Sequence, residues 1–348
     1  DNEAANFDPT RTSLAGHSGS ARLMRTSNSE LMFQSGVAWR SPGFEINDLG
    51  FMRNADQINQ FTWVGYSKRD PFLIFDRWQL NGNQWLDWDF GGNFLGYRWN
   101  VNTNAQFKNK IHAGMGVTRR GEFTSNTELR GGPASLWPGD WSYNLWVGTD
   151  SRKKVYGSFG GSLKDRDDDA GNFEELWASL SFRPSNALRF SMSPSLSQNR
   201  PEMQYVSTEA FGEEDRYLFS TLDQETFALT LRIDYSITPD LTIQFYGAPF
   251  VSVGRYASFK RITDPKAGAF NNRFSTFGAD QIVFDPDEGV YSVDENGDGV
   301  ADYSFGDPAF DLRDFNSNLV VRWEYRPGST VYLVWSQSRF SSERIGRD

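Results

Sequence analysis

Hydrophobic and polar residues alternate one by one along stretches of this chain that are much longer than an ordinary strand. Between 95 and 108 the odd positions are Leu95, Tyr97, Trp99, Val101, Thr103, Ala105 and Phe107, and the even ones are Gly96, Arg98, Asn100, Asn102, Asn104, Gln106 and Lys108. Because successive side chains of a strand point to opposite faces, the pattern predicts strands with one apolar and one polar face. It recurs at 141–147, 187–197, 226–237 and 319–325, and helical spacing is nowhere sustained.

The segments between these stretches fall into two lengths. Short polar turns rich in Pro, Asn, Asp and Gly are expected at 26–30, 68–71, 107–110, 149–153, 183–187, 238–240 and 326–329. Longer connections are expected at 41–57, 121–139, 165–172, 199–224 and 254–314. Short turns at one end of the strands and long loops at the other are typical of outer-membrane barrels, in which the short turns are periplasmic.

These observations predict an all-β fold, an antiparallel up-and-down transmembrane β-barrel of about 14 strands (range 12–16), since seven short turns join about fourteen strands. The whole chain, 1–348, is expected to form this single domain, with 254–314 as a long extracellular loop or hairpin insertion. Part of that insertion should fold as a strand extension or hairpin, because sixty residues without regular structure would be unusual. The alternative is a soluble β-sandwich, whose strands are shorter and whose connections are not sorted by length.

Composition agrees with a barrel. Aromatic residues make up 16% of the 348 residues, although the mean hydropathy is only -0.59. No apolar run is long enough for a membrane helix, which needs about 20 residues. Aromatic residues near the predicted strand ends suit the membrane interface: Trp39, Tyr66, Trp99, Phe107, Trp141, Tyr235, Tyr325 and Trp335.

Charge and cysteine content exclude several functions. The net charge of -10 argues against nucleic acid as a partner, which requires a basic surface. The absence of cysteine excludes disulfides, thiolate metal sites and a cysteine nucleophile. The chain begins DNEAANFDPT without the features of an export signal, so we expect a mature form or a fragment.

Segments along nearly the whole chain resemble a family of uncharacterised outer-membrane proteins that carry a carbohydrate-binding family 9-like domain ahead of a C-terminal barrel. The matching segments include GTDSRKK (148–154), RPSNAL (183–188) and VDENGDGVADYSFG (293–306). The others are 4–14, 39–61, 104–109, 129–134, 235–256 and 317–339. The resemblance implies the barrel half of such a protein in the cell outer membrane, with lipid, and glycans or other outer-membrane proteins, as partners. The carbohydrate-binding domain has no counterpart among these residues.

One local motif could hold a cation. Asp294, Asn296, Asp298 and Asp302, with Gly299, follow the spacing D-x-N-G-D-G-x-x-D, in which oxygen ligands alternate as in a calcium loop. The position at which an EF-hand supplies its bidentate Glu is Phe305, and no flanking helices are predicted. The same residues would also suit a hairpin tip built from Asx-turns and glycine, and both interpretations remain open.

Catalytic candidates are few. The two histidines are His17, near the N-terminus, and His112, on the polar face of a predicted strand. Asp87 and Asp89 are expected on one strand face, but i, i+2 spacing does not establish glycosidase geometry. The acidic residues Asp165, Asp167, Asp168, Asp169, Glu174 and Glu175 are interpreted as a solvated loop. We therefore expect no enzymatic activity.

The predicted lumen has both signs of charge: Arg98, Lys108, Arg183, Arg189, Arg232, Asp234, Arg322 and Glu324. About fourteen strands enclose more space than their own side chains fill, so the 254–314 insertion is the candidate to cap it. Two functions follow. One is a pore for small solutes or glycans, linked to a carbohydrate-binding domain. The other is an occluded barrel that anchors a partner or an outer-membrane complex.

Overall fold

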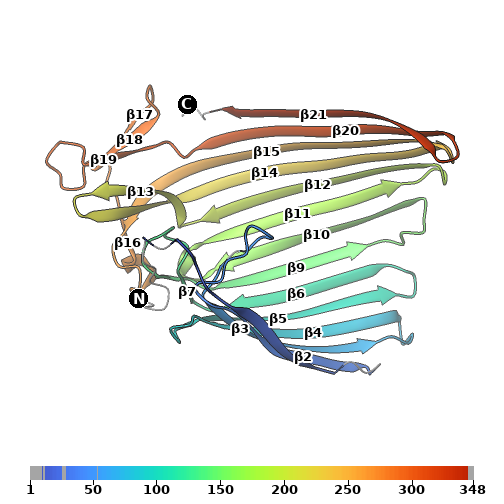
Figure 1. Ribbon diagram of the computed structural model, residues 1–348, viewed down its shortest axis with the longest axis horizontal. Helices are drawn as coiled ribbons and strands as arrows, with labels where there is room; N and C mark the ends of the chain where they lie inside the picture. The colour runs from blue at the N-terminus through green and yellow to red at the C-terminus, as the bar shows by residue number, and fades with distance from the viewer. Residues whose placement is uncertain (1–9, 11, 26–28, 53, 344–348) are drawn as a thin grey trace.

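The computed structural model describes residues 10, 12–25, 29–52 and 54–343, and antiparallel strands dominate it (Figure 1). Fourteen strands of the described chain follow one another in the main path of one sheet. In sheet order they are β1 (Ser18–Met24), β2 (Leu31–Arg40), β3 (Gln57–Lys68), β4 (Phe75–Trp88), β5 (Phe94–Phe107), β6 (His112–Arg120), β9 (Asp140–Gly148), β10 (Val155–Arg166), β11 (Gly171–Phe182), β12 (Leu188–Pro201), β14 (Glu214–Thr238), β15 (Leu241–Ile262), β20 (Phe310–Arg326) and β21 (Ser329–Glu343). The predicted all-β antiparallel sheet is confirmed, and the main path has the predicted number of strands.

The short turns predicted from the sequence join consecutive strands at one end of the sheet, the turn end (Figure 1). The segments between the strands there are 25–30, 69–74, 108–111, 149–154, 183–187, 239–240 and 327–328. Residues 26–28 of the first turn lie outside the described residues. Local turn chemistry was sufficient for this prediction because a tight turn depends on the residues within it.

The longer connections gather at the opposite end, the loop end (Figure 1). The prediction of a loop at 199–224 was wrong. That stretch forms the end of β12, then β13 (Gln204–Phe211), which pairs with the first part of β14 as a hairpin. The segment 72–93 contains β4 and a connection of only five residues at 89–93. The first part of β14 has consecutive apolar residues at 217–219 and no clear alternation, so the sequence pattern did not mark the hairpin.

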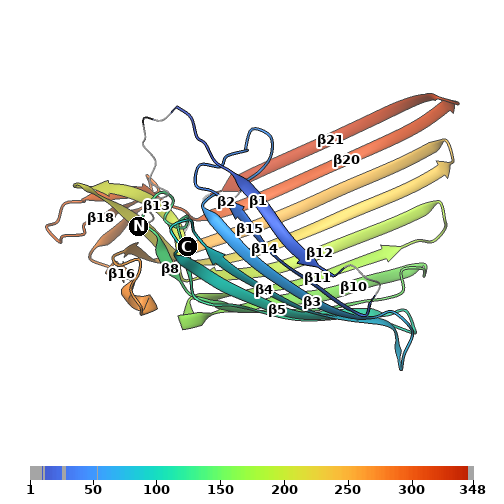
Figure 2. The same cartoon turned by 60° about the horizontal axis from the view of Figure 1, so that its bottom comes forward.

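The sheet is open. Within the described residues β1 pairs with β2 alone, and β21 pairs with β20 alone. Figure 2 shows the sheet curving into a trough rather than lying flat. The closed barrel that the sequence predicts is therefore not what the structure shows, and the coarser prediction of an antiparallel sheet holds.

No helix among the described residues is both long enough and apolar enough to cross a membrane.

The 254–314 insertion contains regular structure, as expected. β15 continues to Ile262 and pairs with β16 (Phe274–Thr276), and a separate three-stranded sheet follows. That sheet consists of β17 (Ile282–Asp285), β18 (Val290–Val293) and β19 (Tyr303–Gly306). It packs on the extended ends of β14 and β15 through a buried cluster of Leu218, Phe259, Tyr291, Val293, Tyr303 and Phe305. The insertion is thus a folded unit and not an irregular loop.

The buried apolar side chains of the described chain all lie in loop-end elements. They are Leu129, Ala170, Leu218, Phe219, Leu222, Phe259, Phe270, Tyr291, Val293, Tyr303 and Phe305. Within the described residues, the long part of the sheet between the loop end and the turn end has no second layer over its apolar face. The molecule therefore has a hydrophobic core at its loop end and a two-faced, single-layer sheet elsewhere.

Candidate functional site

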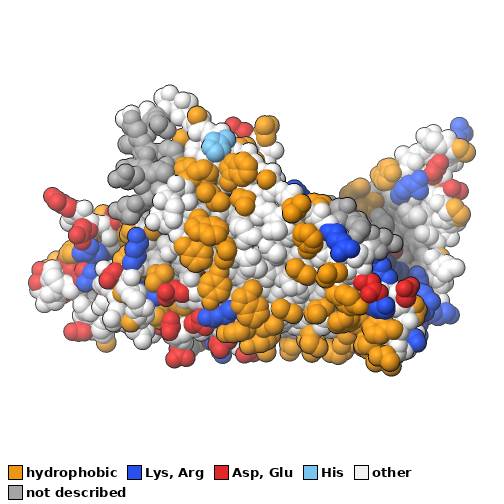
Figure 3. Space-filling model, turned by 90° about the horizontal axis from the view of Figure 1, so that it is seen from below, with side chains coloured by type: hydrophobic (Ala, Val, Ile, Leu, Met, Phe, Trp, Pro, Cys, Tyr) orange, Lys and Arg blue, Asp and Glu red, His pale blue; other side chains and the backbone are white. Residues whose placement is uncertain are grey.

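The two faces of the sheet have opposite chemistry, and the strand register defines them. Leu176, Leu196 and Phe227 are opposite one another on β11, β12 and β14, and each is at least 37% exposed. Their strand neighbours Glu175, Ser197 and Thr226 are opposite one another on the other face. Figure 3 shows hydrophobic side chains spread over the outer surface of the curved sheet, with charged side chains concentrated toward its two ends. We call this surface the outer face and the concave, polar one the inner wall.

A ladder of amide side chains crosses the inner wall on β4, β5 and β6. Asn81 Nδ2 donates to Asn102 Oδ1 at 2.9 Å, and Asn83 Nδ2 donates to Asn100 Oδ1 at 3.0 Å. Asn100 in turn donates to Thr118 Oγ1 at 2.9 Å. Since amides both donate and accept hydrogen bonds, such a ladder presents paired but uncharged polar groups to the trough.

Tryptophan rings lie over glycines on the same wall. Trp146 is in register with Gly114 on β6 and Gly160 on β10, and Gly160 is in register with Trp177 on β11. A Cβ at Gly114 would lie 2.6 Å from Trp146 Nε1, and a Cβ at Gly160 would lie 2.6 Å from Trp177 Cζ2. The indole rings therefore occupy the space above the glycines, as aromatic rings do when they cover a glycine across a sheet.

Charged residues of the inner wall lie mostly toward its two ends. At the loop end Arg120 is opposite both Arg98 and Asp140, and the Arg98 guanidinium lies 4.5 Å from the Trp85 ring centroid. At the turn end Arg189 is opposite Asp234, and Arg322 donates to Glu324 at 2.8 Å.

The predicted luminal positions fall into two groups. Six lie in strands on the inner wall: Arg98, Arg189, Arg232, Asp234, Arg322 and Glu324. Lys108 and Arg183 instead lie just beyond β5 and β11, in the turns, so the prediction for these two was wrong. The reason is that the alternation continues through the strand ends and does not mark where pairing stops.

Between the charged ends, the inner wall of β9 to β14 forms a hollow of about 600 Å³. Hydroxyl and amide side chains on its floor include Ser142, Asn144, Ser162, Ser197, Asn199, Gln224 and Thr226, with Lys164 and Arg166 toward the loop end. Trp146 and Trp177 lie in the adjacent row of the wall, toward the turn end. A hollow with polar groups and aromatic rings suits a polar organic solute.

Two loop-end segments are clamped together beside this hollow. Arg273, 2% exposed, donates to Glu122 Oε2 at 2.6 Å and to the carbonyl oxygens of Leu136, Ala267 and Gly268. Glu122 and Leu136 belong to the 121–139 connection, which contains the hairpin of β7 (Phe123–Ser125) and β8 (Ser135–Trp137). Because one buried cation holds both segments, we call this contact the Arg273 clamp.

The candidate calcium residues gather at the tip between β18 and β19. Asp294 accepts hydrogen bonds from the backbone N–H groups of Gly297, Asp298 and Gly299, and Asp302 accepts from those of Glu295 and Asn296. Among the described residues, no group of three or more His, Cys, Asp or Glu side chains is arranged to hold a metal ion. The carboxylates act here as acceptors for backbone amides, which is the geometry of Asx-turns.

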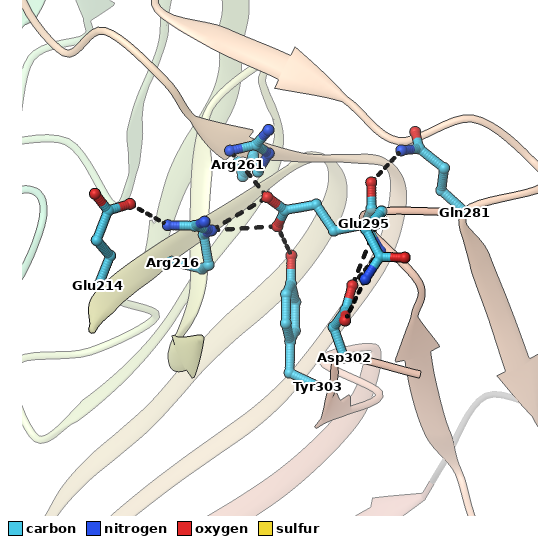
Figure 4. A network of polar contacts seen from close by, with 8 residues as sticks. Glu214, Arg216, Arg261, Gln281, Glu295, Asp302 and Tyr303 are labelled. Atoms are coloured by element: carbon cyan, nitrogen blue, oxygen red, sulfur yellow. Dashed lines mark hydrogen bonds and ion pairs between the residues drawn. The ribbon is translucent and has the colours of Figure 1, made fainter. Parts of the chain in front are cut away.

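Glu295, within the same tip, joins the insertion to the sheet (Figure 4). Its carboxylate, 9% exposed, accepts hydrogen bonds from Arg216 Nε at 3.2 Å and from the Tyr303 hydroxyl at 2.9 Å, and forms an ion pair with Arg261 at 3.1 Å. Burial raises the pKa of Tyr303 above its ordinary value, and the hydrogen bond to Glu295 raises it further. Sequence reasoning missed this network because it joins distant segments: Arg216 and Glu295, for example, are 79 positions apart.

The remaining candidates are separated from one another. The His17 imidazole accepts a hydrogen bond from Trp39 Nε1 at 3.2 Å, whereas His112 lies on the inner wall near Trp146, with ring centroids 6.1 Å apart. Asp87 accepts from Gln57 and Asn59, but Asp89 lies beyond the end of β4 and accepts from both nitrogens of Asn93. The expectation that the two aspartates share a strand face was wrong, because a bulge at Asp87/Trp88 ends the regular strand.

The acidic segment is partly regular. Asp167–Asp169 form a 3-10 turn between β10 and β11. Asp167 accepts two hydrogen bonds from Arg119, at 2.7 and 2.6 Å. The interpretation as a wholly solvated loop was therefore incomplete.

The fold and its wall define a class: an all-β protein built on one large antiparallel sheet with an apolar and a polar face. Residues 3–347 match the family described as a domain of unknown function (DUF5916), and the chain belongs to that family. This agrees with the resemblance to an uncharacterised family and adds nothing on location or carbohydrate binding. No curated protein and no solved structure matches the chain.

Proposed function

We propose that this chain forms an outer-membrane β-barrel whose polar inner wall provides a passage for small polar solutes, glycans among them. One observation carries the proposal: the sheet has a continuous apolar outer face that no part of the described chain covers. Phe159, Leu176 and Leu333 on that face are 64%, 69% and 65% exposed. A water-soluble protein rarely leaves so large an apolar surface uncovered, whereas lipid would cover it.

The height of the apolar face suits a bilayer. Along β5 the aromatic residues Trp99 and Phe107 are eight positions apart, which corresponds to about 27 Å of strand. A tilt of about 40° reduces this to about 20 Å, close to the apolar band of about 25 Å in outer-membrane barrels. Toward the loop end the band stops at one level, since Glu174, Gln198 and Glu225 are in register on β11, β12 and β14.

A membrane position requires that the sheet edges be paired, because unpaired backbone groups are costly in lipid. An even number of strands in the main path makes β1 and β21 antiparallel to each other. Direct pairing of the two would complete an all-antiparallel barrel of fourteen strands. We therefore propose that these edges pair with each other in the membrane.

The chain has no cysteine, so edge pairing can be tested by introduced disulfides. Ala21→Cys is combined in turn with Val331→Cys, Leu333→Cys and Trp335→Cys, all on the outer face of β1 or β21. Ala21 is opposite Val37 across β1 and β2, so Ala21→Cys with Val37→Cys is the positive control. A cross-link in the control and in one edge pair is expected. A cross-link in the control alone would exclude direct pairing of the edges.

Membrane insertion and conduction are tested separately. The protein should require detergent, and its electrophoretic mobility should change on heating; solubility without detergent would contradict the barrel. In planar bilayers, stable open conductance steps are expected of a pore.

The second candidate is an occluded barrel that anchors a partner, and the Arg273 clamp favours it. The clamp holds the 121–139 and 265–276 segments at the mouth of the trough. If the clamp closes the passage, the intact protein is silent in bilayers and Arg273→Ala or deletion of 123–137 restores conductance. Equal conductance in all three proteins would exclude occlusion by these segments.

A further inference from the structure

The inner wall has a central zone with few charged side chains. In one row across the strands, Asn81, Asn102, Asn144, Ser162, Ser197, Thr226 and Ser252 are linked by register, and Glu175 is the single charged member of that row between β4 and β15. The next row toward the turn end contains Gln79, Asn104, Gly114, Trp146, Gly160, Trp177, Ser195 and Ala228. A ligand seated here would meet mainly amides, hydroxyls and indole rings, with Glu175 as the charged side chain of these two rows.

The two tryptophans of this zone lie in line. Trp146 and Trp177 are both in register with Gly160, and β10 alone separates their strands. Neighbouring strands are about 4.8 Å apart, so the two Cα atoms are about 10 Å apart across the wall. Each ring leans over a glycine toward the N-terminal neighbouring strand, Trp146 over Gly114 and Trp177 over Gly160. One extended molecule can therefore contact both rings.

The rings are presented to the trough. Both indoles are half-buried, and the glycines beneath them let the rings rest close to the backbone. In this arrangement each ring covers a glycine and stays partly exposed on the inner wall, within reach of a ligand in the trough. The electron-rich face of an indole attracts the positively polarised C–H edge of a nonpolar or sugar-like surface.

The surrounding groups specify a polyhydroxylated ligand. Asn144, Ser162 and Ser197, in the row beside the rings, supply hydrogen-bond donors and acceptors without charge. Glu175, in register with Ser162 and Ser197, would repel an anionic group beside the rings, and the cationic Lys164 and Arg166 lie farther toward the loop end. A wholly apolar ligand would leave the polar groups around the hollow without partners. Sugars combine stacking C–H faces with uncharged hydroxyl groups.

We propose that Trp146 and Trp177 form a tandem stacking platform that binds a neutral oligosaccharide along the inner wall. This inference rests on the proposed function in one respect, since it names a ligand class for the same trough. The residues assigned to the platform are Trp146, Trp177 and the glycines Gly114 and Gly160, and Asn144 and Ser162 supply hydrogen bonds beside it.

The test uses the full chain in detergent micelles and measures binding by titration calorimetry and tryptophan fluorescence. The probes are maltohexaose, cellohexaose and laminarihexaose, with hexagalacturonate as the acidic counterpart and a hexapeptide rich in tyrosine as an aromatic peptide. We expect binding of at least one neutral hexasaccharide. Trp146→Ala or Trp177→Ala should weaken its Kd by about tenfold, the equivalent of roughly 1.4 kcal/mol.

Matched variants separate stacking from folding. Trp335→Ala removes an exposed tryptophan from the outer face of β21 and should leave the Kd unchanged. Trp146→Phe keeps an aromatic ring and should retain most of the affinity. Trp146→Leu keeps apolar bulk without a ring and should lose affinity as Trp146→Ala does. If Trp146 acted only as structural bulk, the Phe and Leu variants would bind equally well. The folding of each of these variants is compared with that of the parent chain by circular dichroism and by the mobility change on heating.

The inference is overturned if no neutral hexasaccharide binds, if the alanine variants bind unchanged, or if the acidic sugar or the peptide binds more tightly. These outcomes are distinguishable from failure of the proposed function. Open conductance without sugar binding would contradict the stacking platform and support the pore. Sugar binding by a protein that shows no conductance in bilayers, even after removal of the clamp, would contradict the pore and support the stacking platform.

Discussion

The indole of Trp146 fills the space that a side chain at Gly114 would occupy, because an ideal Cβ at Gly114 would lie 2.6 Å from Trp146 Nε1 and 2.8 Å from Cε2. The two residues are opposite each other on β9 and β6. A glycine in the middle of a strand ordinarily weakens it, and a covering aromatic ring is a known compensation.

Gly114→Val should therefore displace the Trp146 ring and the Asn104 side-chain amide, whose Oδ1 would lie 2.5 Å from the new Cβ, and lower the free energy of unfolding by about 1–3 kcal/mol, the usual range for overpacking. Urea unfolding in detergent, followed by circular dichroism, measures the change. Gly82→Val is the matched control, since a Cβ at Gly82 on the neighbouring part of the sheet meets nothing within 4 Å. Equal destabilisation by the two variants would contradict a specific contact between Trp146 and Gly114.

Glu295→Gln should loosen the insertion. The carboxylate is 9% exposed and contacts Arg216, Arg261 and Tyr303, so the substitution removes the anion that pairs with Arg261 and leaves Arg216 with the exposed Glu214. Removing one member of a buried charge cluster costs about 3–5 kcal/mol. Hydrogen exchange of β17 to β19 should accelerate, while exchange in β9 to β12 should not change. Glu214→Gln is the control, because the Glu214 side chain is 76% exposed although it also pairs with Arg216.

The raised pKa of Tyr303 predicts that the insertion loses stability at high pH. Burial, and then the hydrogen bond to Glu295, raises the pKa of Tyr303 above its ordinary value of 10.0. The folded chain then holds the hydroxyl proton more tightly than the unfolded chain does. Its contribution is complete below pH 10 and is lost as the pH rises toward the folded-state pKa. Unfolding of the insertion measured between neutral pH and pH values above 10 should show this fall, and Tyr303→Phe should abolish it. An unchanged profile in Tyr303→Phe would assign the fall to another group.

Asp294→Ala should destabilise the tip between β18 and β19. The Asp294 carboxylate accepts hydrogen bonds from three backbone N–H groups. A hydrogen bond to a charged group contributes about 1.5–3 kcal/mol to the free energy of unfolding, and less where water can take the place of the lost acceptor. Water can reach this exposed tip, so we expect a total loss of about 1–2 kcal/mol. Proteolysis at 294–302 is the measurement, and Asp287→Ala in another exposed turn is the control.

Calcium titration decides between the two interpretations of the same tip. A calcium loop predicts that the parent chain binds Ca²⁺ and that Asp298→Ala binds less. A tip built from Asx-turns predicts no difference in bound Ca²⁺ between the two proteins. Equal binding in the calorimeter would therefore end the calcium hypothesis for Asp294, Asn296, Asp298 and Asp302.

Much of the architecture follows from the sequence alone. A strand can be predicted from an alternation between near neighbours in the sequence, and a tight turn can be predicted from the few residues within it. For this reason the two-faced strands, the seven short turns and a main path of fourteen strands could be predicted. The inner-wall positions of Arg98, Arg232 and Asp234 followed from the same alternation.

Only the tertiary structure decided how distant segments meet. The Arg273 clamp joins residues 151 positions apart, and Glu295 reaches Arg216 across 79 positions. Trp146 lies over Gly114, but the alternation that places both on the inner wall says nothing about which side chain leans toward which neighbour. The core of the insertion was also hidden, because the apolar residues of β13 and of the first part of β14 do not alternate regularly with polar ones and pack against partners more than 40 positions away. Local pattern determines which way a side chain faces, and long-range pairing determines what it meets there.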